Sequence, residues 1–144
     1  MKVAAVAAVW MLITATTGCA AIAHADGAQF FQSPSGNISC LLYLFPVNTG
    51  SADCQIRDST WAAPPRPSNC QGGWGDSLGI VQGEPAKLEC RTDRLLGENS
   101  PTLAYGSAQT VAEITCDSEL SGMTCRDSST GHFFFLSRDS YQLG

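Results

Sequence analysis

Short alternating runs of apolar and polar residues dominate the chain after residue 25, and no long stretch shows the 3.6-residue period of a helix. Residues 53–57 alternate strictly, and residues 110–116 are rich in the β-branched side chains that favour strands. Clusters of Gly, Pro, Asn and Ser, the residues that favour tight turns, separate these runs. The pattern predicts an all-β domain, a small sandwich or barrel of about seven short strands.

The individual strands are predicted from the same alternation. We expect a hairpin turn over residues 119–122, and one helical turn over residues 137–141 near the end of the chain. Three prolines exclude helix and central strand between residues 61 and 70, so an extended strap with Trp61 as its core anchor is expected there. The predicted strands are 37–45, 53–57, 80–81, 86–90, 102–106, 110–116 and 132–136.

The N-terminal segment has a different pattern from the rest of the chain. Lys2 precedes a stretch without charge from residue 3 to residue 23, and Ala23-His24-Ala25 fits the small-x-small motif of signal peptidase. Residues 1–25 are therefore predicted to be a signal peptide, and residues 26–144 a single disulfide-stabilised domain. Two alternatives stay open: a lipobox ending at Cys19, which would be acylated, or an uncleaved membrane anchor.

The chain contains 7 cysteines, and either cleavage of the signal or acylation of Cys19 leaves six of them for pairing. Six cysteines in a short exported chain are typical of a disulfide framework. The expected location is therefore extracellular, or on the membrane as a lipoprotein. Six cysteines allow 15 connectivities, and the sequence leaves the choice among them open. The predicted pairs are Cys40–Cys54, Cys70–Cys90 and Cys116–Cys125.

The charge balance narrows the classes of partner. Only Lys2 among the 8 basic residues lies before residue 26, and all 13 acidic residues lie after residue 25, so the predicted domain carries a net charge of −6. A surface that follows phosphates needs a basic cluster, and the sequence has none. Nucleic acid is not an expected partner. Contact with a membrane is expected only through an uncleaved or lipidated N-terminus.

One motif suggests chemistry. Gly75-Asp76-Ser77-Leu78-Gly79 fits the nucleophile-elbow pattern and resembles the signature of the GDSL esterases. No helix-forming segment follows it, and the Asp-x-x-His that those enzymes carry near the C-terminus is missing, so a glycine-rich turn is the favoured interpretation. A small hydrolase that uses Ser77 or His132 remains the alternative function. No catalytic residue and no cofactor is predicted. No metal site is predicted either, because the cysteine spacings differ from those of zinc knuckles.

Aromatic residues indicate a possible binding surface. A strand over Phe133, Phe134 and Phe135 points rings to both faces of its sheet, so one ring can lie on the surface. The candidate binding residues are Trp74, Tyr105, His132 and Phe133. The predicted function is a non-enzymatic binding module of the cell envelope or the medium, with a protein or another envelope component as its ligand.

Several segments along the chain carry a common pattern. They are Phe31 to Cys40, Cys54-Gln-Ile, Trp61 with its prolines, Trp74-Gly75, Leu103 to Gly106, Gly122 to Cys125, and Thr130-Gly131-His132-Phe133. Together they resemble a family of small secreted or lipoprotein-like actinobacterial proteins, of mycobacterial type, with one domain of unknown function. The family pattern has Pro before Tyr-Gly and Gly after Gly-His, where this chain has Ala104 and Phe133. The resemblance implies compartment and fold, and it carries no catalytic residue.

Overall fold

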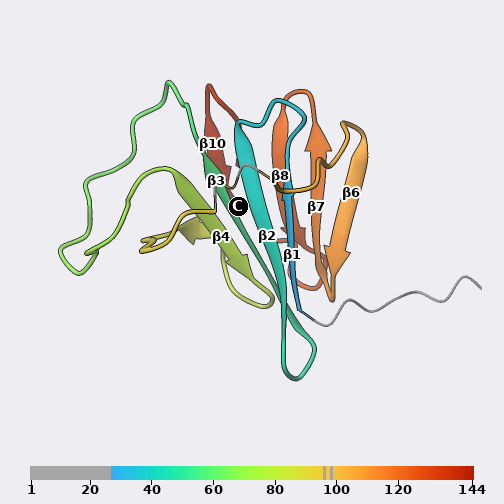
Figure 1. Cartoon of the computed structure of the whole chain (residues 1–144). Helices are drawn as coiled ribbons and strands as arrows, with labels where there is room; N and C mark the ends of the chain where they lie inside the picture. Colours follow the sequence, from blue (N-terminus) through green and yellow to red (C-terminus); the bar gives the residue numbers. More distant parts are fainter. Residues whose placement is uncertain (1–26, 96, 98) are drawn as a thin grey trace, which may run out of the picture.

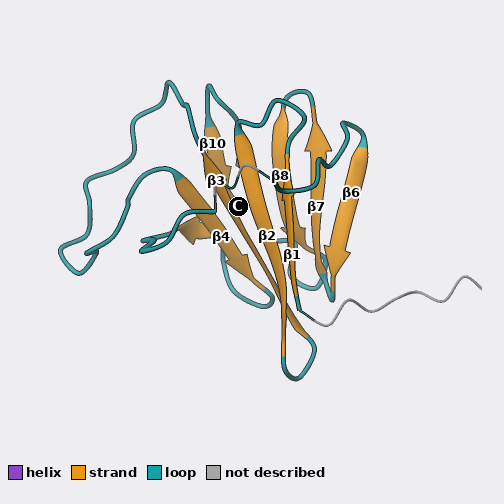
Figure 2. Cartoon of the chain, in the orientation of Figure 1, coloured by secondary structure: helices purple, strands orange, loops and turns teal. Residues whose placement is uncertain are grey.

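The computed structural model describes residues 27–95, 97 and 99–144, and the predicted signal peptide, with Cys19, lies outside this range. Two antiparallel sheets of five strands each pack face to face as a sandwich (Figures 1 and 2). None of the described residues belongs to a helix long and apolar enough to cross a membrane. The strands are β1 (Ala28–Gln32), β2 (Ile38–Phe45), β3 (Thr49–Ile56), β4 (Ser77–Val81), β5 (Lys87–Leu88), β6 (Ser107–Val111), β7 (Ile114–Glu119), β8 (Gly122–Asp127), β9 (Phe133–Leu136) and β10 (Tyr141–Leu143).

Each sheet is a simple meander in which every strand pairs with its neighbours in the chain. Strands β1 to β5 form the first sheet, and strands β6 to β10 form the second. The connection between the sheets runs past the edge of β1, where the Gln32 N–H donates to the carbonyl of Pro101 at 2.9 Å. The connecting segment therefore partly covers β1, an edge strand that would otherwise expose its backbone N–H and C=O groups.

The all-β prediction is confirmed, and the described part of the chain has ten strands where about seven were predicted. The run 110–116 is not one strand, because a two-residue turn at Ala112 and Glu113 divides it into β6 and β7. Ala112 has a φ of 46°, a conformation that L-residues rarely adopt and that no Gly or Asn signals in the sequence. The helical turn predicted over 137–141 is a turn followed by β10, and the predicted strand 102–106 contributes only an isolated bridge at Thr102.

The proline strap was predicted to anchor on Trp61, and this is confirmed. Trp61 packs against the hydrophobic core, and its ring centroid lies 4.7 Å from that of Tyr141 in β10. Its indole N–H donates to the carbonyl of Ser137 at 3.0 Å. The strap that leaves the first sheet is therefore fixed to the second.

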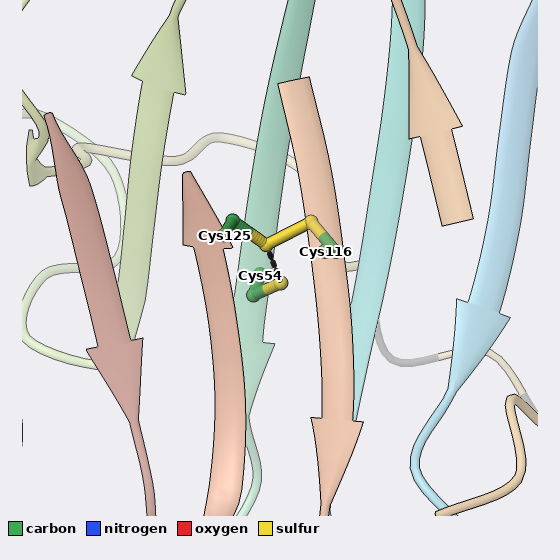
Figure 3. A group of neighbouring side chains, drawn as sticks. All are labelled: Cys54, Cys116 and Cys125. Carbon is green, nitrogen blue, oxygen red and sulfur yellow. Dashed lines mark hydrogen bonds between the residues drawn. A yellow bond between two sulfur atoms is a disulfide. The ribbon is translucent and has the colours of Figure 1, made fainter. Parts of the chain in front are cut away.

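The three predicted disulfides are present. Cys40–Cys54 joins directly opposite residues of β2 and β3, and Cys116–Cys125 does the same for β7 and β8. Both face the core, where the sulfur of Cys54 lies 3.8 Å from that of Cys125 (Figure 3). The two sheets thus meet through two stacked disulfides at the centre of the core.

The third disulfide, Cys70–Cys90, lies outside this contact and joins the proline strap to the segment after β5. Cys70 is buried and Cys90 is exposed. This bond therefore fixes a long loop to the first sheet rather than filling the core.

The hairpin between β2 and β3 extends beyond the rest of the sandwich (Figure 1). Its three-residue loop contains Val47 and Asn48, with φ angles of 70° and 61°. A β-branched residue in this left-handed conformation is an outlier and costs about 1–2 kcal/mol. Val47 is 93% exposed, so few contacts within the protein offset that cost.

Candidate functional site

A cleft of about 440 Å³ opens at one end of the sandwich, which we call the loop end. The turns between β1 and β2, β7 and β8, and β9 and β10 meet there, together with the end of β3. Both sheets therefore contribute walls. The lining residues are Ser33, Ser35, Gly36, Asn37, Ile38, Arg57, Asp58, Tyr105, Glu119, Leu120, Ser121, Gly122, Ser137, Arg138 and Asp139.

The cleft lining combines both signs of charge with exposed apolar groups. Two guanidinium groups, from Arg57 and Arg138, come from opposite sheets. Tyr105 is 42% exposed and Leu120 is 84% exposed. Ligand pockets are usually mostly apolar with a few polar groups. This lining is more polar than that, so it suits a polar ligand better than an apolar one.

Hydrogen bonds hold the walls of the cleft in place. The side-chain amide of Asn37 donates to the carbonyl of Asp58 at 3.0 Å, and the Asp58 N–H donates back to Asn37 Oδ1 at 2.9 Å. Across the sheets, the Thr60 N–H donates to the carbonyl of Arg138 at 2.8 Å. Since these bonds fix the backbone beside Asp58 and Arg138, the cleft is formed before any ligand binds.

The structure does not bring the four candidate binding residues into one surface. Tyr105 lines the cleft at the loop end, whereas His132 and Phe133 lie beside the start of β9, at the opposite end of the second sheet. Trp74 is half-buried, and its indole N–H donates to the carbonyl of Pro64 at 2.8 Å. Arg57 and Arg138 were not singled out, because only the turns that meet at the loop end place them together.

The aromatic run of β9 divides its rings between the two faces of the sheet. Phe134 is fully buried, whereas Phe133 and Phe135 are half-buried on the outer face. The guanidinium of Arg126 lies over the ring of Phe133, 5.5 Å from its centroid. A cation at this distance stabilises the ring where it stands, so part of this aromatic surface already has a partner within the chain.

Ser77 and His132 lie at opposite ends of the sandwich. Ser77 is fully buried at the start of β4, and its hydroxyl donates to Asp76 Oδ1 at 3.2 Å. The strand that follows it lacks the exposed strand-to-helix turn that a nucleophile elbow needs. The geometry therefore gives no serine–histidine pair from these two residues.

The cysteine cluster in the core is not a thiolate site. The sulfur atoms of Cys54, Cys116 and Cys125 lie within 4.8 Å of one another and are buried. All three are bonded in disulfides, and a metal needs deprotonated thiolates as ligands. Their proximity is a packing contact.

A buried carboxylate links the two sheets at the end opposite the cleft. Asp127, at the end of β8, is fully buried and accepts hydrogen bonds from the Gly83 N–H at 2.6 Å and the Ser129 N–H at 2.8 Å. The hydroxyls of Ser129 and Thr130 donate to it as well. Burial raises the pKa of this carboxyl, but these hydrogen bonds outweigh burial, and the pKa is lower than its ordinary value.

Two further carboxylates lie together on the outer face of the first sheet. One oxygen each of Asp53 and Glu89 would stand within 2.7 Å of a Cβ added at Gly79, so the absent side chain makes room for both. Burial raises the pKa of Asp53. The positive charge of Arg91, whose Nη1 lies 3.5 Å from Asp53 Oδ1, offsets part of this rise. Burial likewise raises the pKa of Glu89, offset in part by Lys87. Glycine within a strand is the only sequence signal of this close approach.

Comparison with known families gives a match that spans nearly the whole chain. Residues 9–143 match the model of DUF6636, described as a family of unknown function. The chain belongs to this family. The DUF6636 match covers every described strand and begins within the segment predicted to be a signal peptide. No curated protein and no solved structure matches the chain.

Proposed function

We propose that this protein is an exported, non-enzymatic binding module of the cell envelope or the medium, and that its ligand occupies the cleft at the loop end. The cleft itself is the observation that carries the proposal, because both sheets wall it and hydrogen bonds hold it open. Export is supported by the three disulfides, which persist in oxidising compartments.

The composition of the cleft favours a polar ligand with an apolar face, as in a short saccharide of the envelope. Tyr105 offers an exposed ring for such a face. Arg57 and Arg138 offer donors for hydroxyl or carboxylate oxygens, and Asp58 and Asp139 accept from hydroxyls. A strongly anionic ligand fits less well, since Glu119 joins the two aspartates in the lining.

A binding titration tests this proposal. With soluble cell-wall saccharides, titrated singly and followed by calorimetry, we expect Tyr105→Ala and Arg57→Ala each to weaken binding at least tenfold. An interaction of about 1.4 kcal/mol corresponds to that factor. Arg94→Ala is the matched control, because Arg94 is exposed but lies outside the cleft.

The result can also contradict the proposal in two ways. If the cleft variants and Arg94→Ala weaken saccharide binding equally, the ligand does not occupy the cleft. If no saccharide fraction binds the unsubstituted protein, the proposed ligand class is wrong.

A further inference from the structure

The end of the sandwich opposite the cleft carries an exposed apolar projection, which we call the hairpin tip and define as residues 43–48. Phe45 is 42% exposed and Val47 is 93% exposed. The ring of Tyr43 stacks edge-on against Phe45 with centroids 4.8 Å apart. The sequence contains no charged residue from Asn37 to Ala52.

The apolar surface continues from the hairpin tip along the outer face of the first sheet. Phe30 in β1 is 48% exposed and pairs with Leu41 of β2, next to the strand segment that leads to the tip. The outer face of an antiparallel sandwich ordinarily meets water and alternates to polar residues. Here that alternation fails along β1 and β2.

The backbone conformation of Val47 also indicates that the hairpin tip contacts something outside the molecule. A turn at this position accommodates Gly or Asn without strain, and Val is unfavourable there. Its methyl groups are almost wholly exposed, so they make few contacts within the fold. An exposed, strained apolar residue is best explained by a contact outside the molecule.

The hairpin tip reaches beyond the neighbouring turns at the same end of the sandwich. The N–H of Gly50 donates to Gln82 Oε1 at 3.1 Å, and a Cβ at Gly50 would lie 2.6 Å from the carbonyl of Val111. Gly50 is therefore level with the ends of β4 and β6. The hairpin between β2 and β3 continues past these strand ends, as Figure 1 shows.

The chain also enters the domain at this end. Ala28 pairs with Tyr43, so the polypeptide that precedes β1 arrives beside the hairpin tip. Its sequence is uncharged from residue 3 to residue 23, and Cys19 stands nine positions before Ala28. Nine extended residues reach about 30 Å, so any anchor in that stretch would hold this end of the domain close to a bilayer.

From these observations we infer that the hairpin tip contacts a lipid bilayer surface, with Phe45 and Val47 inserted among the outermost acyl chains. An uncharged aromatic and aliphatic loop suits this interface, where Tyr and Trp rings and apolar side chains gather. The contact is apolar rather than electrostatic. It does not depend on the proposed saccharide site, which lies at the opposite end.

Quenching by brominated lipid tests the contact. The exported full chain would be mixed with phosphatidylcholine vesicles, with or without bromine on the acyl chains, and the emission of an introduced tryptophan measured by difference from the unsubstituted protein. We expect Val47→Trp to lose at least half of its emission in brominated vesicles. Leu120→Trp, at a residue that is 84% exposed but lies at the loop end, is the matched control, and its emission should be unchanged.

A second variant guards against an effect of the substitution on folding. Val47→Asn removes the apolar side chain, and Asn tolerates the left-handed conformation. We expect its vesicle-bound fraction in sedimentation to fall at least fivefold, and the binding of the unsubstituted protein to be unaffected by high salt.

Several outcomes would overturn the inference. These are an unquenched Val47→Trp, equal quenching of both tryptophans, vesicle binding abolished by salt, or unchanged sedimentation of Val47→Asn. Protection of the hairpin tip by an envelope protein, in a chain that leaves vesicles untouched, would assign this surface to protein docking instead and would also overturn it.

Discussion

Replacing Cys116 and Cys125 together by alanine is expected to lower the free energy of unfolding by about 3.6–4.6 kcal/mol, against about 3.3 kcal/mol for replacing Cys70 and Cys90. Chain entropy alone predicts the opposite order. The Cys116–Cys125 bond, with a sequence separation of 9, contributes about 2.6 kcal/mol by loop closure. The Cys70–Cys90 bond, with a sequence separation of 20, contributes about 3.3 kcal/mol. The order reverses because the core bond also fills space.

The location of the sulfur atoms supplies the difference. Cys116 and Cys125 are fully buried, and the Cys125 sulfur packs against Cys54 of the other sheet. Alanine at both positions leaves a cavity there, which adds about 1–2 kcal/mol. Cys90 is exposed, and Cys70 is buried but lies outside the core cluster between the sheets, so the Cys70 and Cys90 variant leaves no cavity in that core.

Urea unfolding of the two double variants, followed by fluorescence, gives both free energies. A larger loss for the Cys70 and Cys90 variant would show that loop closure, and not packing between the sheets, determines what each disulfide contributes. Full reduction of all three bonds should unfold the domain, because their sum is comparable to the total stability of a domain of this size.

Replacing Asp127 by alanine is expected to cost about 3 kcal/mol. The substitution leaves the N–H groups of Gly83 and Ser129 without their acceptor, and each unpaired buried donor costs about 1–3 kcal/mol. Asp127→Asn should lose somewhat less, since its amide keeps one oxygen but turns an NH₂ group towards a donor. Asp117→Asn is the matched control on the adjacent strand and should be nearly neutral.

The pH dependence of this effect has a definite sign. The pKa of Asp127 is lower in the folded state than its ordinary value of about 4 in the unfolded chain. The contribution of Asp127 to the free energy of unfolding is therefore complete above the pKa of the unfolded chain, and it is lost as the pH falls through the folded-state pKa. The difference in unfolding free energy between wild type and Asp127→Asn should shrink on acidification, and a difference that stays constant would contradict the ionised hydrogen-bonded state.

Asp53 and Glu89 act in the opposite direction and at higher pH. Burial raises the pKa of both, so the folded state binds their protons more readily than the unfolded chain does. Stability therefore increases as the pH falls from their raised values towards the ordinary ones. Comparing wild type with Asp127→Asn at each pH removes this contribution, because both proteins retain the pair.

The sequence was sufficient for the fold class, because alternation is a local signal. It did not determine the disulfide pairs, since six cysteines allow 15 connectivities, and the predicted choice among them is the one in the structure. It was insufficient at Ala112, where a positive φ in a residue with no turn preference divides one predicted strand into two. Short strands such as β10, with three residues, also leave too weak a pattern to separate from a turn.

The candidate site was predictable only in part. Tyr105 was singled out for its aromatic ring, but the neighbours that give it a cleft lie in turns far apart in the sequence. The role of Asp127 depends on Gly83, 44 residues away in the other sheet. Contacts between distant turns have no periodicity, so no sequence pattern marks them.

The division of the sandwich into two consecutive meanders has a consequence for the chain after proteolysis. All three disulfides join residues within one half: two lie before residue 91 and one lies after residue 115. A single cut in the connection between β5 and β6 would therefore leave two fragments that no disulfide of the described residues joins. They would stay associated through the stacked core disulfides and Asp127 under native conditions, and would separate in denaturant without any reductant.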